Sequence, residues 1–277
     1  MTDDSALKLK VAAIQLNSQQ DYQENLEATL SLMRSAIRES KAQLLVLPEN
    51  CFCFGASGLM ELVRNSAVVL EAICGFCEKE KVAVVVGSMP VEAEAGRYWS
   101  QSILISPEGK VIQRYNKVHL FDVSVADAHG AYRESDQYQA GNRVAVGTVL
   151  GAHLGLSICY DLRFPALYQS MRMQGAEVLT VPAAFTYVTG QAHWEMLIRT
   201  RAVETQCFVV AANQCGSHSK GRSTWGHSMI VDPWGRVLAE CGQEPSYCVA
   251  ELDFSVLTEV RRKMPITEHL RPDVYRL

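Results

Sequence analysis

Three side chains with complementary chemistry each follow a segment that is typical of a β-strand. The side chains are Glu49, Lys117 and Cys159, and the segments before them are 44–47, 110–115 and 153–158. A cysteine thiolate is a nucleophile, a carboxylate can accept its proton, and a lysine ammonium can stabilise an oxyanion. Because strand ends in α/β proteins meet at pockets, we expect the three side chains to share one pocket.

The chemistry that these groups could perform is attack of a thiol on an acyl carbon. A free thiol has a pKa of about 8.5, so it needs a base or a cationic neighbour at neutral pH. Glu49 would take the thiol proton and later return it to a leaving amine. Lys117 and the backbone N–H of Tyr160 would stabilise the oxyanion that forms on the attacked group.

Each of these residues also has an ordinary structural interpretation. A single cysteine after a buried strand is commonly a packing residue. A Pro-Glu pair such as Pro48-Glu49 often caps a helix or lies in a solvated turn, and a single lysine is usually on the surface. Convergence of the three residues on one pocket would separate the two interpretations.

Other reaction classes have weaker support. Cys74 and Cys77 have the spacing of a redox dithiol, but the same spacing places both on one face of a helix, and no thioredoxin-like start precedes them. The seven histidines form neither His-x-His nor His-Glu-x-x-His, so we expect no metal site and no cofactor. A thiol–imidazole pair of Cys159 with His193 or His227 would leave Glu49 and Lys117 without a role.

Composition restricts the class of protein and of partner. The 277 residues are 48% hydrophobic and 20% charged, which is typical of a globular protein with a large core. A net charge of −4 without a basic cluster argues against nucleic acid or anionic membrane as a partner. No apolar run approaches the length of a membrane span, and the nine cysteines lack the spacing of a disulfide framework. We therefore expect a cytoplasmic protein with reduced thiols.

Apolar runs and helical periodicity alternate along the chain and predict an α/β fold. Fully apolar strands must be buried on both faces, and the many hairpin signals argue against one purely parallel sheet. We expect two mixed β-sheets with helices outside, in a single domain spanning 1–277. The predicted strands are 9–16, 44–47, 82–86, 101–106, 110–115, 144–149, 153–158, 178–181, 207–211, 228–231, 237–239 and 247–252, and the predicted helices are 25–37, 68–77, 165–174 and 192–204.

Three segments lack periodicity. Residues 123–142 contain Gly, Asp, His and Tyr and are typical of a long functional loop, and residues 185–191 follow a predicted strand end. We expect both segments to line the pocket. Residues 254–277 are polar with two prolines, and we expect them to lie as a tail over a surface.

Three ordered motifs resemble the signatures of the nitrilase, or carbon–nitrogen hydrolase, superfamily. They are Leu47-Pro48-Glu49, Tyr115-Asn116-Lys117-Val118-His119-Leu120-Phe121-Asp122 and Ile158-Cys159-Tyr160-Asp161-Leu162-Arg163-Phe164-Pro165. The resemblance spans nearly the whole chain and implies a four-layer α-β-β-α sandwich that pairs into a homodimer. It also implies a Glu49–Lys117–Cys159 triad that hydrolyses a C–N bond through a thioester intermediate.

The loop after the lysine motif departs from the pattern of the superfamily. Many members carry a second glutamate there, and Glu134 resembles it. Members usually have a Pro-Gly turn after Leu-Phe-Asp, whereas this chain has Val125-Ala126-Asp127-Ala128-His129-Gly130 and is one residue longer. The register of Glu134 is therefore less firmly predicted than the triad.

Segments of the C-terminal half resemble the branch that contains deaminated glutathione amidase. They are 190–195, 199–207 and 226–235. The resemblance implies a small α-keto acid amide as substrate, with omega-amidase activity on 2-oxoglutaramate or hydrolysis of another small amide or carbamoyl compound as alternatives. A substrate carboxylate would need a cation, and the nearest candidates by sequence are Arg199, Arg201 and Arg163. Each could equally be a structural ion-pair partner, and we favour that interpretation for Arg163. We therefore expect Arg199 or Arg201 at the carboxylate, with Phe185 and Thr186 beside the substrate.

Overall fold

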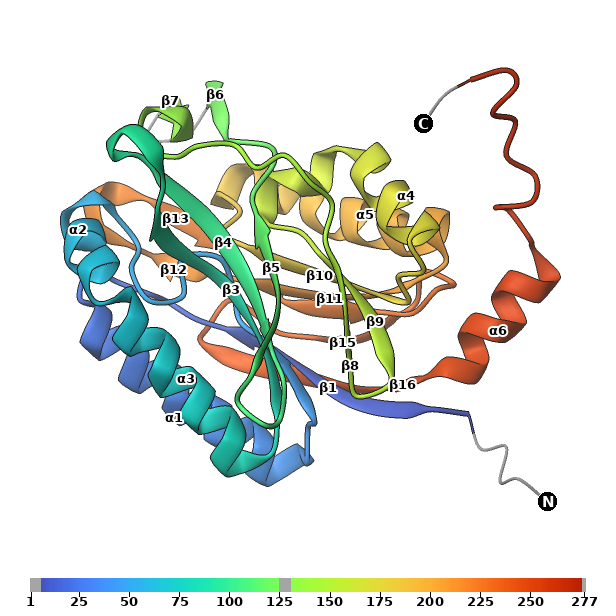
Figure 1. Cartoon of the computed structure of the whole chain (residues 1–277), viewed down its shortest axis with the longest axis horizontal. Coiled ribbons are helices and arrows are strands. Elements are labelled where there is room, and N and C mark those ends of the chain that lie inside the picture. The colour runs from blue at the N-terminus through green and yellow to red at the C-terminus, as the bar shows by residue number, and fades with distance from the viewer. Residues whose placement is uncertain (1–5, 125–130, 276–277) are drawn as a thin grey trace.

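Two six-stranded β-sheets packed face to face form the centre of the structure, a computed structural model that describes residues 6–124 and 131–275 (Figure 1). The first sheet has the order β16 (Ser246–Asp253), β1 (Lys8–Gln15), β2 (Leu44–Val46), β3 (Ala83–Glu92), β4 (Tyr98–Ile105) and β5 (Val111–Asn116). The second has the order β15 (Val237–Glu240), β14 (Met229–Val231), β11 (Phe208–Asn213), β10 (Val178–Ala183), β9 (Ala152–Leu156) and β8 (Val146–Val149).

Both sheets are mixed, as the sequence predicts. In the first sheet β1, β2 and β3 are parallel, whereas β16, β4 and β5 are joined by antiparallel pairings. In the second sheet β9, β10 and β11 are parallel and the outer strands are antiparallel. The parallel strands at the centre of each sheet are the fully apolar segments, because they are covered on both faces.

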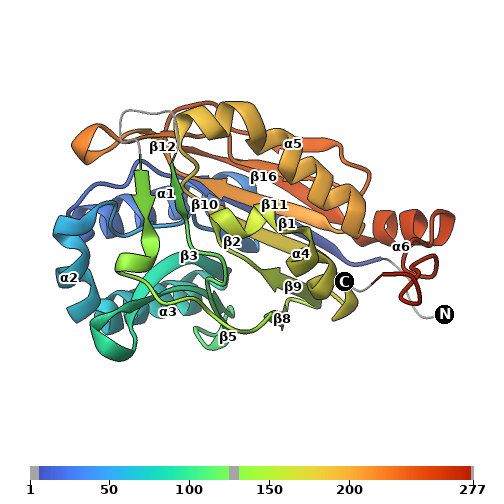
Figure 2. The ribbon, with the colours of Figure 1, turned by 90° about the horizontal axis from the view of Figure 1, so that it is seen from above.

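Helices cover the two outer faces of this pair of sheets and complete the predicted α-β-β-α layers (Figures 1 and 2). The first sheet is covered by α1 (Tyr22–Ser40) and α3 (Ser66–Glu80), with α2 (Ala56–Arg64) before α3. The second is covered by α4 (Pro165–Met173) and α5 (Tyr187–Thr205). The helix α6 (Phe254–Lys263) follows β16 at the far end of the molecule.

The alternation of side chains along β1 explains this layering. Val11 and Ala13 belong to the core between the two sheets, whereas Ala12 and Ile14 belong to the core under α1 and α3. Successive side chains of a strand point to opposite faces, so a strand that is apolar at every position needs a partner on each side. The second sheet provides one partner and the helices provide the other.

Two features of the structure differ from the sequence predictions. Helix α2 is absent from the prediction, since its nine residues fall in a stretch that gives only a short periodic signal. The prediction of a tail over 254–277 is wrong for its first ten residues, which form α6. Phe254, Leu257 and Val260 are buried on one face of this helix, and Asp253 caps its first turn.

Short elements occupy the loops near the end of the sheets. The strands β6 (Asp122–Ser124) and β7 (Ala131–Arg133) pair within the predicted loop, and β12 (Cys215–Ser217) pairs with β13 (Ser223–Trp225). The insertion predicted at 125–130 lies outside the described residues. In the part of the chain that is described, no helix has the length and apolar character needed to span a bilayer.

Candidate active site

The strands that precede the three predicted residues end at one place. Both β5 and β2 run in the same direction as β3, because β4 pairs antiparallel to β3 and β5 pairs antiparallel to β4. The carboxyl ends of β2 and β5 therefore bring Glu49 and Lys117 to the same edge of the first sheet. Cys159 follows β9 of the second sheet, and all three residues line one cavity. The predicted convergence is confirmed.

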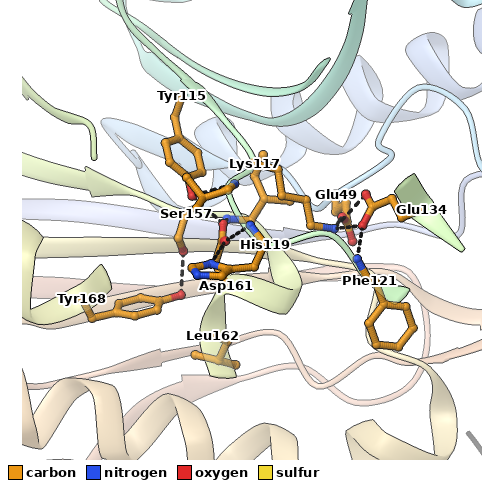
Figure 3. A network of polar contacts seen from close by, with 12 residues as sticks. Glu49, Tyr115, Lys117, His119, Phe121, Glu134, Ser157, Asp161, Leu162 and Tyr168 are labelled. Atoms are coloured by element: carbon orange, nitrogen blue, oxygen red, sulfur yellow. Dashed lines mark hydrogen bonds and ion pairs between the residues drawn. The ribbon is translucent and has the colours of Figure 1, made fainter. Parts of the chain in front are cut away.

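Lys117 is buried between two carboxylates (Figure 3). Its Nζ lies 2.7 Å from Glu49 Oε1 and 2.8 Å from Glu134 Oε2. The Lys117 side chain is only 2% exposed. Glu134 is held in place by the backbone N–H of Phe121, which donates to Glu134 Oε2 at 2.7 Å. Glu134 thus lies beside the lysine, despite the longer loop that precedes it.

The environment shifts the pKa values of Lys117 and Glu134. Desolvation lowers the pKa of Lys117, but the negative charges of Glu134 and Glu49 outweigh it and hold that pKa well above its usual value. Desolvation raises the pKa of Glu134, and the charge of Lys117 opposes this shift. Lys117 is therefore a permanent cation in the cavity.

Cys159 is the first residue of the 3-10 helix η3 (Cys159–Arg163), which follows β9. Its φ of 48° is in the left-handed region, which costs a non-glycine residue about 1–2 kcal/mol. Desolvation and the charge of Glu49 raise the pKa of its thiol well above the usual value, whereas Lys117 and the backbone N–H of Ala184 act in the opposite direction. The resting thiol is therefore protonated, with a carboxylate beside it.

A buried carboxylate, Asp161, connects the turn that carries Cys159 to the segment that carries Lys117 (Figure 3). Its Oδ2 accepts hydrogen bonds from Tyr115 Oη at 2.8 Å and from the backbone N–H of Ile158 at 2.9 Å. Its Oδ1 accepts from the backbone N–H of His119 at 3.1 Å and from His119 Nδ1 at 2.8 Å. A carboxylate only accepts, so Nδ1 of His119 carries the proton.

The cavity has a volume of about 310 Å³ and reaches from the triad residues to the short strands β7 and β13. Its wall is partly aromatic, since the rings of Tyr132, Phe121 and Tyr160 follow one another with centroids 5.1 Å apart at each step. A small organic molecule fits this size, because pockets for such ligands begin at roughly 300 Å³. The other lining residues include Phe54, Tyr138, Ala184, Phe185, Thr186, Thr189, Arg133, Asp136, Arg163 and Arg222.

The predicted pocket residues divide into two groups. Tyr160, Phe185 and Thr186 line the cavity, as expected. Arg199 and Arg201 do not, so their assignment to a substrate carboxylate is wrong. Both arginines lie on α5 and make hydrogen bonds outside the cavity.

Arg201 and Arg199 lie on different faces of α5. The guanidinium of Arg201 is buried and donates from Nε and Nη2 to the carbonyl of Leu162, and from Nη1 to Glu204. Arg199 donates to the carbonyl of Gly235 and pairs with Glu195 on the outer face. Arg201 therefore fixes η3, and Arg199 fixes the turn between β14 and β15.

Arg163 is the arginine that the cavity contains close to Cys159. In the described part of the chain its guanidinium contacts His193 Nδ1 at 3.3 Å and lies over the ring of Phe185, 5.4 Å from the centroid, rather than beside a carboxylate. The interpretation of Arg163 as a structural ion-pair partner is therefore wrong. Arg163 follows Cys159 by four residues and lines the same cavity, so a cation lies near the Cys159 thiol.

The described residues support neither a redox dithiol at Cys74 and Cys77 nor a metal site. Cys74 and Cys77 are free thiols on α3, and desolvation raises the pKa of both, that of Cys77 to about 12. A redox dithiol needs the opposite shift in its attacking thiol. Over 6–124 and 131–275, no group of three His, Cys, Asp or Glu side chains is arranged to hold a metal ion.

Sequence reasoning missed two kinds of functional residue. Asp161 stands inside the cysteine motif, but two of the residues that donate to it, Tyr115 and His119, lie 46 and 42 residues earlier in the chain, so no local signal shows these contacts. Arg222, Ser223 and Thr224 belong to a polar hairpin that has no periodicity, yet they form part of the cavity wall.

This chain is similar to known proteins over most of its length. The family model for carbon-nitrogen hydrolases matches residues 10–262. The deaminated glutathione amidase of Yersinia enterocolitica is 38% identical over 269 residues, which are 94% of this chain and 92% of that protein. The crystal structure of the Caenorhabditis elegans NitFhit protein superimposes with a TM-score of 0.91 at 34% identity, covering 98% of this chain and 67% of that one.

A more distant solved structure records chemistry at a cysteine. It is a glutamate-to-glutamine mutant of the amidase from Nesterenkonia sp. AN1, which shows covalent addition of the acetamide moiety of fluoroacetamide at the active site cysteine. This structure is 25% identical, has a TM-score of 0.79, and covers 98% of this chain and 99% of that one. The match of the family model over most of the chain, together with these relatives, shows that the protein belongs to the carbon–nitrogen hydrolase family.

Proposed function

We propose that this protein is an amidase that hydrolyses the C–N bond of a small α-keto acid amide through a cysteine thioester. The observation that carries the proposal is the buried cation Lys117, held between Glu49 and Glu134 in the cavity that Cys159 also lines. Burying three charged groups together is costly unless they pair, and such groups concentrate at functional sites.

The geometry supports a reaction in two halves. As the amide carbonyl is attacked, the Cys159 thiol gives its proton to Glu49, and the new oxyanion is stabilised by Lys117 and the backbone N–H of Tyr160. Glu49 then returns the proton to the amide nitrogen, the C–N bond breaks and the amine leaves, which produces the thioester. Water attacks the thioester, again giving a proton to Glu49, and the acid and the free thiol are restored.

Two supports come from outside the triad. The glutamate-to-glutamine mutant of the Nesterenkonia amidase, which is similar over nearly its full length, shows covalent addition of the acetamide moiety of fluoroacetamide at its active site cysteine. The described contacts of the Glu134 carboxylate join it to the Lys117 ammonium and to the backbone N–H of Phe121, so we assign it the role of holding that ammonium in place.

We propose deaminated glutathione as the preferred substrate, with 2-oxoglutaramate as the alternative. The similar proteins that carry the name deaminated glutathione amidase support this order. The α-keto acid carboxylate would bind Arg163, whose planar guanidinium lies in the cavity near Cys159 and can form a charge-assisted pair. Simple nitriles should be poor substrates, because their nitrogen must be protonated with tighter demands on placement.

The test is steady-state kinetics on deaminated glutathione, 2-oxoglutaramate and a simple nitrile, combined with intact-mass spectrometry. We expect the highest kcat/KM for deaminated glutathione, and a Cys159→Ala variant that folds but does not turn over. A higher kcat/KM for 2-oxoglutaramate would replace the substrate with that of an omega-amidase. Hydrolysis of a carbamoyl compound alone would reject the whole substrate class, and covalent modification at Cys51 or Cys207 with loss of activity would reject Cys159.

We further propose that the chain folds as one domain, pairs into a homodimer and works in the cytoplasm, where thiols are kept reduced. The outer face of α5 exposes Val188, Met196 and Val203, and Trp234 lies close by and is 53% exposed. Apolar side chains grouped in this way are typical of an interface with a second copy. Light scattering after size exclusion should give a dimer, and Met196→Lys with Val203→Lys should give a monomer.

A further inference from the structure

The backbone directly after Glu49 has an uncommon conformation. Asn50 has a φ of 56°, in the left-handed region that few residues other than glycine adopt, although asparagine is among the more tolerant. A sparsely populated backbone conformation persists only where the surrounding contacts hold it. The contacts of the peptide group between Glu49 and Asn50 therefore decide how the Glu49 side chain is presented to the cavity.

This peptide group is held on both sides by buried side chains. Its N–H, that of Asn50, donates to Ser88 Oγ at 2.9 Å. Its carbonyl, that of Glu49, accepts from Gln214 Nε2 at 3.0 Å. Ser88 belongs to β3 of the first sheet, whereas Gln214 directly follows β11 of the second sheet. Gln214 is fully buried, and its hydrogen bond ties the turn of Glu49 to the sheet that positions Cys159.

The side-chain amide of Gln214 is fixed in one orientation. Its Oε1 accepts from the backbone N–H of Ser18 at 3.0 Å, and its Nε2 donates to Ser18 Oγ at 2.9 Å as well as to the carbonyl of Glu49. The reverse orientation would place the amide oxygen against the Glu49 carbonyl and the NH2 group against the Ser18 N–H, so it satisfies neither. The Ser18 hydroxyl in turn donates to the carbonyl of Cys51, two residues after Glu49.

The backbone of Gln214 is also fixed, beside the nucleophile. Its N–H donates to the carbonyl of Ala183 at 3.0 Å, and Gln214 forms a β-bridge with Leu16. Ala183 ends β10, and the next residue, Ala184, lines the cavity and directs its backbone N–H toward the Cys159 thiol. Gln214 therefore connects the segment beside the thiol to the turn that carries the base.

We propose that Gln214 is a positioning residue for the general base, which fixes the Glu49–Asn50 peptide from the second sheet and so holds the Glu49 carboxylate toward the Cys159 thiol. The inference rests on the proposed function, in which Glu49 takes the thiol proton. Without the Nε2 donor, the Glu49 carbonyl is free to rotate and Asn50 relaxes to the common negative φ. The carboxylate then shifts relative to the thiol, and proton transfer becomes slower.

The test compares Gln214→Met with Gln15→Met. Gln15 is a matched control, because it is also fully buried and its amide donates to the carbonyls of Gly242 and Glu244 and accepts from the N–H and hydroxyl of Ser228. These bonds reach residues 228–244 rather than a segment that carries a triad residue. We expect kcat of Gln214→Met to fall by about 10- to 100-fold with KM within about 3-fold. Gln15→Met should keep kcat within about 3-fold at a comparable loss of thermal stability.

The pH profile of Cys159 alkylation by iodoacetamide distinguishes a displaced base from a destabilised fold. The charge of Glu49 raises the pKa of Cys159, so a carboxylate that has moved away raises it less. Alkylation of Gln214→Met should therefore occur at lower pH than in the wild-type protein, in the same direction as in Glu49→Gln. Gln15→Met should keep the wild-type profile.

Ser18→Ala keeps the proposal falsifiable if Gln214→Met does not fold. The Ser18 hydroxyl links Gln214 Nε2 to the carbonyl of Cys51 in the same turn, so its loss should produce the same two changes to a smaller extent. A wild-type kcat and alkylation profile in Gln214→Met, or in Ser18→Ala where that variant replaces it, overturns the proposal for Gln214. Equal changes in Gln15→Met also overturn it. Full turnover by Glu49→Gln overturns the proposed function instead.

Discussion

Replacing Asp161 by asparagine should separate the position of Cys159 from its chemistry. The Asp161 carboxylate is fully buried and accepts hydrogen bonds from Ile158, Tyr115 and His119, and it does not line the cavity. Asparagine has the same shape but replaces one oxygen with an NH2 group. In either orientation this group faces a backbone N–H, that of Ile158 or that of His119, and that donor then loses its acceptor.

The magnitude follows from this single mismatch. The phenol of Tyr115 and the imidazole of His119 can reverse their hydrogen bonds, but a backbone N–H cannot. One buried unsatisfied donor costs about 1–3 kcal/mol, so we expect the melting temperature of Asp161→Asn to fall by roughly 2–12 °C. The turn that carries Cys159 should relax, and a nucleophile displaced by about 1 Å typically loses about 100-fold in rate.

The assay is kcat and KM on the best amide substrate, with the rate of Cys159 alkylation by iodoacetamide measured by mass spectrometry. We expect kcat to fall by about 100-fold while KM changes by less than about 3-fold. Asp232→Asn is the chemically matched control, because Asp232 is also buried but accepts the N–H groups of Trp234 and Arg236 in a remote turn. Ile73→Ala, in the core under α3, controls for lost stability.

The result that would refute the reasoning is also specific. If Asp161→Asn lowers the melting temperature as Ile73→Ala does, but keeps the wild-type kcat and alkylation rate, Asp161 is only a structural residue. The same conclusion follows if Ile73→Ala loses as much kcat as Asp161→Asn at equal loss of stability. The carboxylate would then stabilise the fold without setting the position of the thiol.

The remaining predictions concern ionisation and the other thiols. Glu49→Gln removes a negative charge that raises the pKa of Cys159, so alkylation of Cys159 should occur at lower pH. The same change removes the base, and kcat should fall by about 10²–10⁴-fold. An unchanged alkylation profile together with active turnover would contradict the role of Glu49. Because desolvation raises the pKa of Glu134 above its usual 4.5, the loss of activity on acidification should already begin above pH 4.5, and a Glu134→Gln variant that keeps this decline would reject the assignment. The double variant Cys74→Ser, Cys77→Ser should keep its kcat, and activity that follows the redox state of these thiols would show that they are functional.

The sequence predicted the residues that follow strands better than those that lie on helices. Glu49 and Cys159 come after apolar runs, Lys117 comes after a segment typical of a β-strand, and the carboxyl ends of such strands meet in space. Arg199 and Arg201 were misassigned because a sequence motif does not state which way a helix faces. On α5 the buried positions include Trp194 and Ile198, and Arg201 follows at the same helical spacing, so it points into the protein, toward the carbonyl of Leu162.

Other parts of the site could not be predicted because they depend on contacts between distant segments. The guanidinium of Arg222 lies over the ring of Tyr132, which belongs to a loop about 90 residues earlier in the chain. Neither segment has a periodic pattern. Helix α6 is different, since Asp253 at its start and the spacing of Phe254, Leu257 and Val260 are signals that the polar character of the tail concealed.

The division of the site between two sheets explains why a buried carboxylate is needed. Glu49 and Lys117 follow strands of the first sheet, and Cys159 follows a strand of the second. The two sheets are joined by an apolar core, whose packing is strong but not directional, so it does not by itself fix the thiol relative to the lysine. Hydrogen bonds are directional, and those of Asp161 reach from the Cys159 turn to the residues on both sides of Lys117. We infer that Asp161, which does not line the cavity, helps to hold the Cys159 thiol in position relative to the Lys117 ammonium.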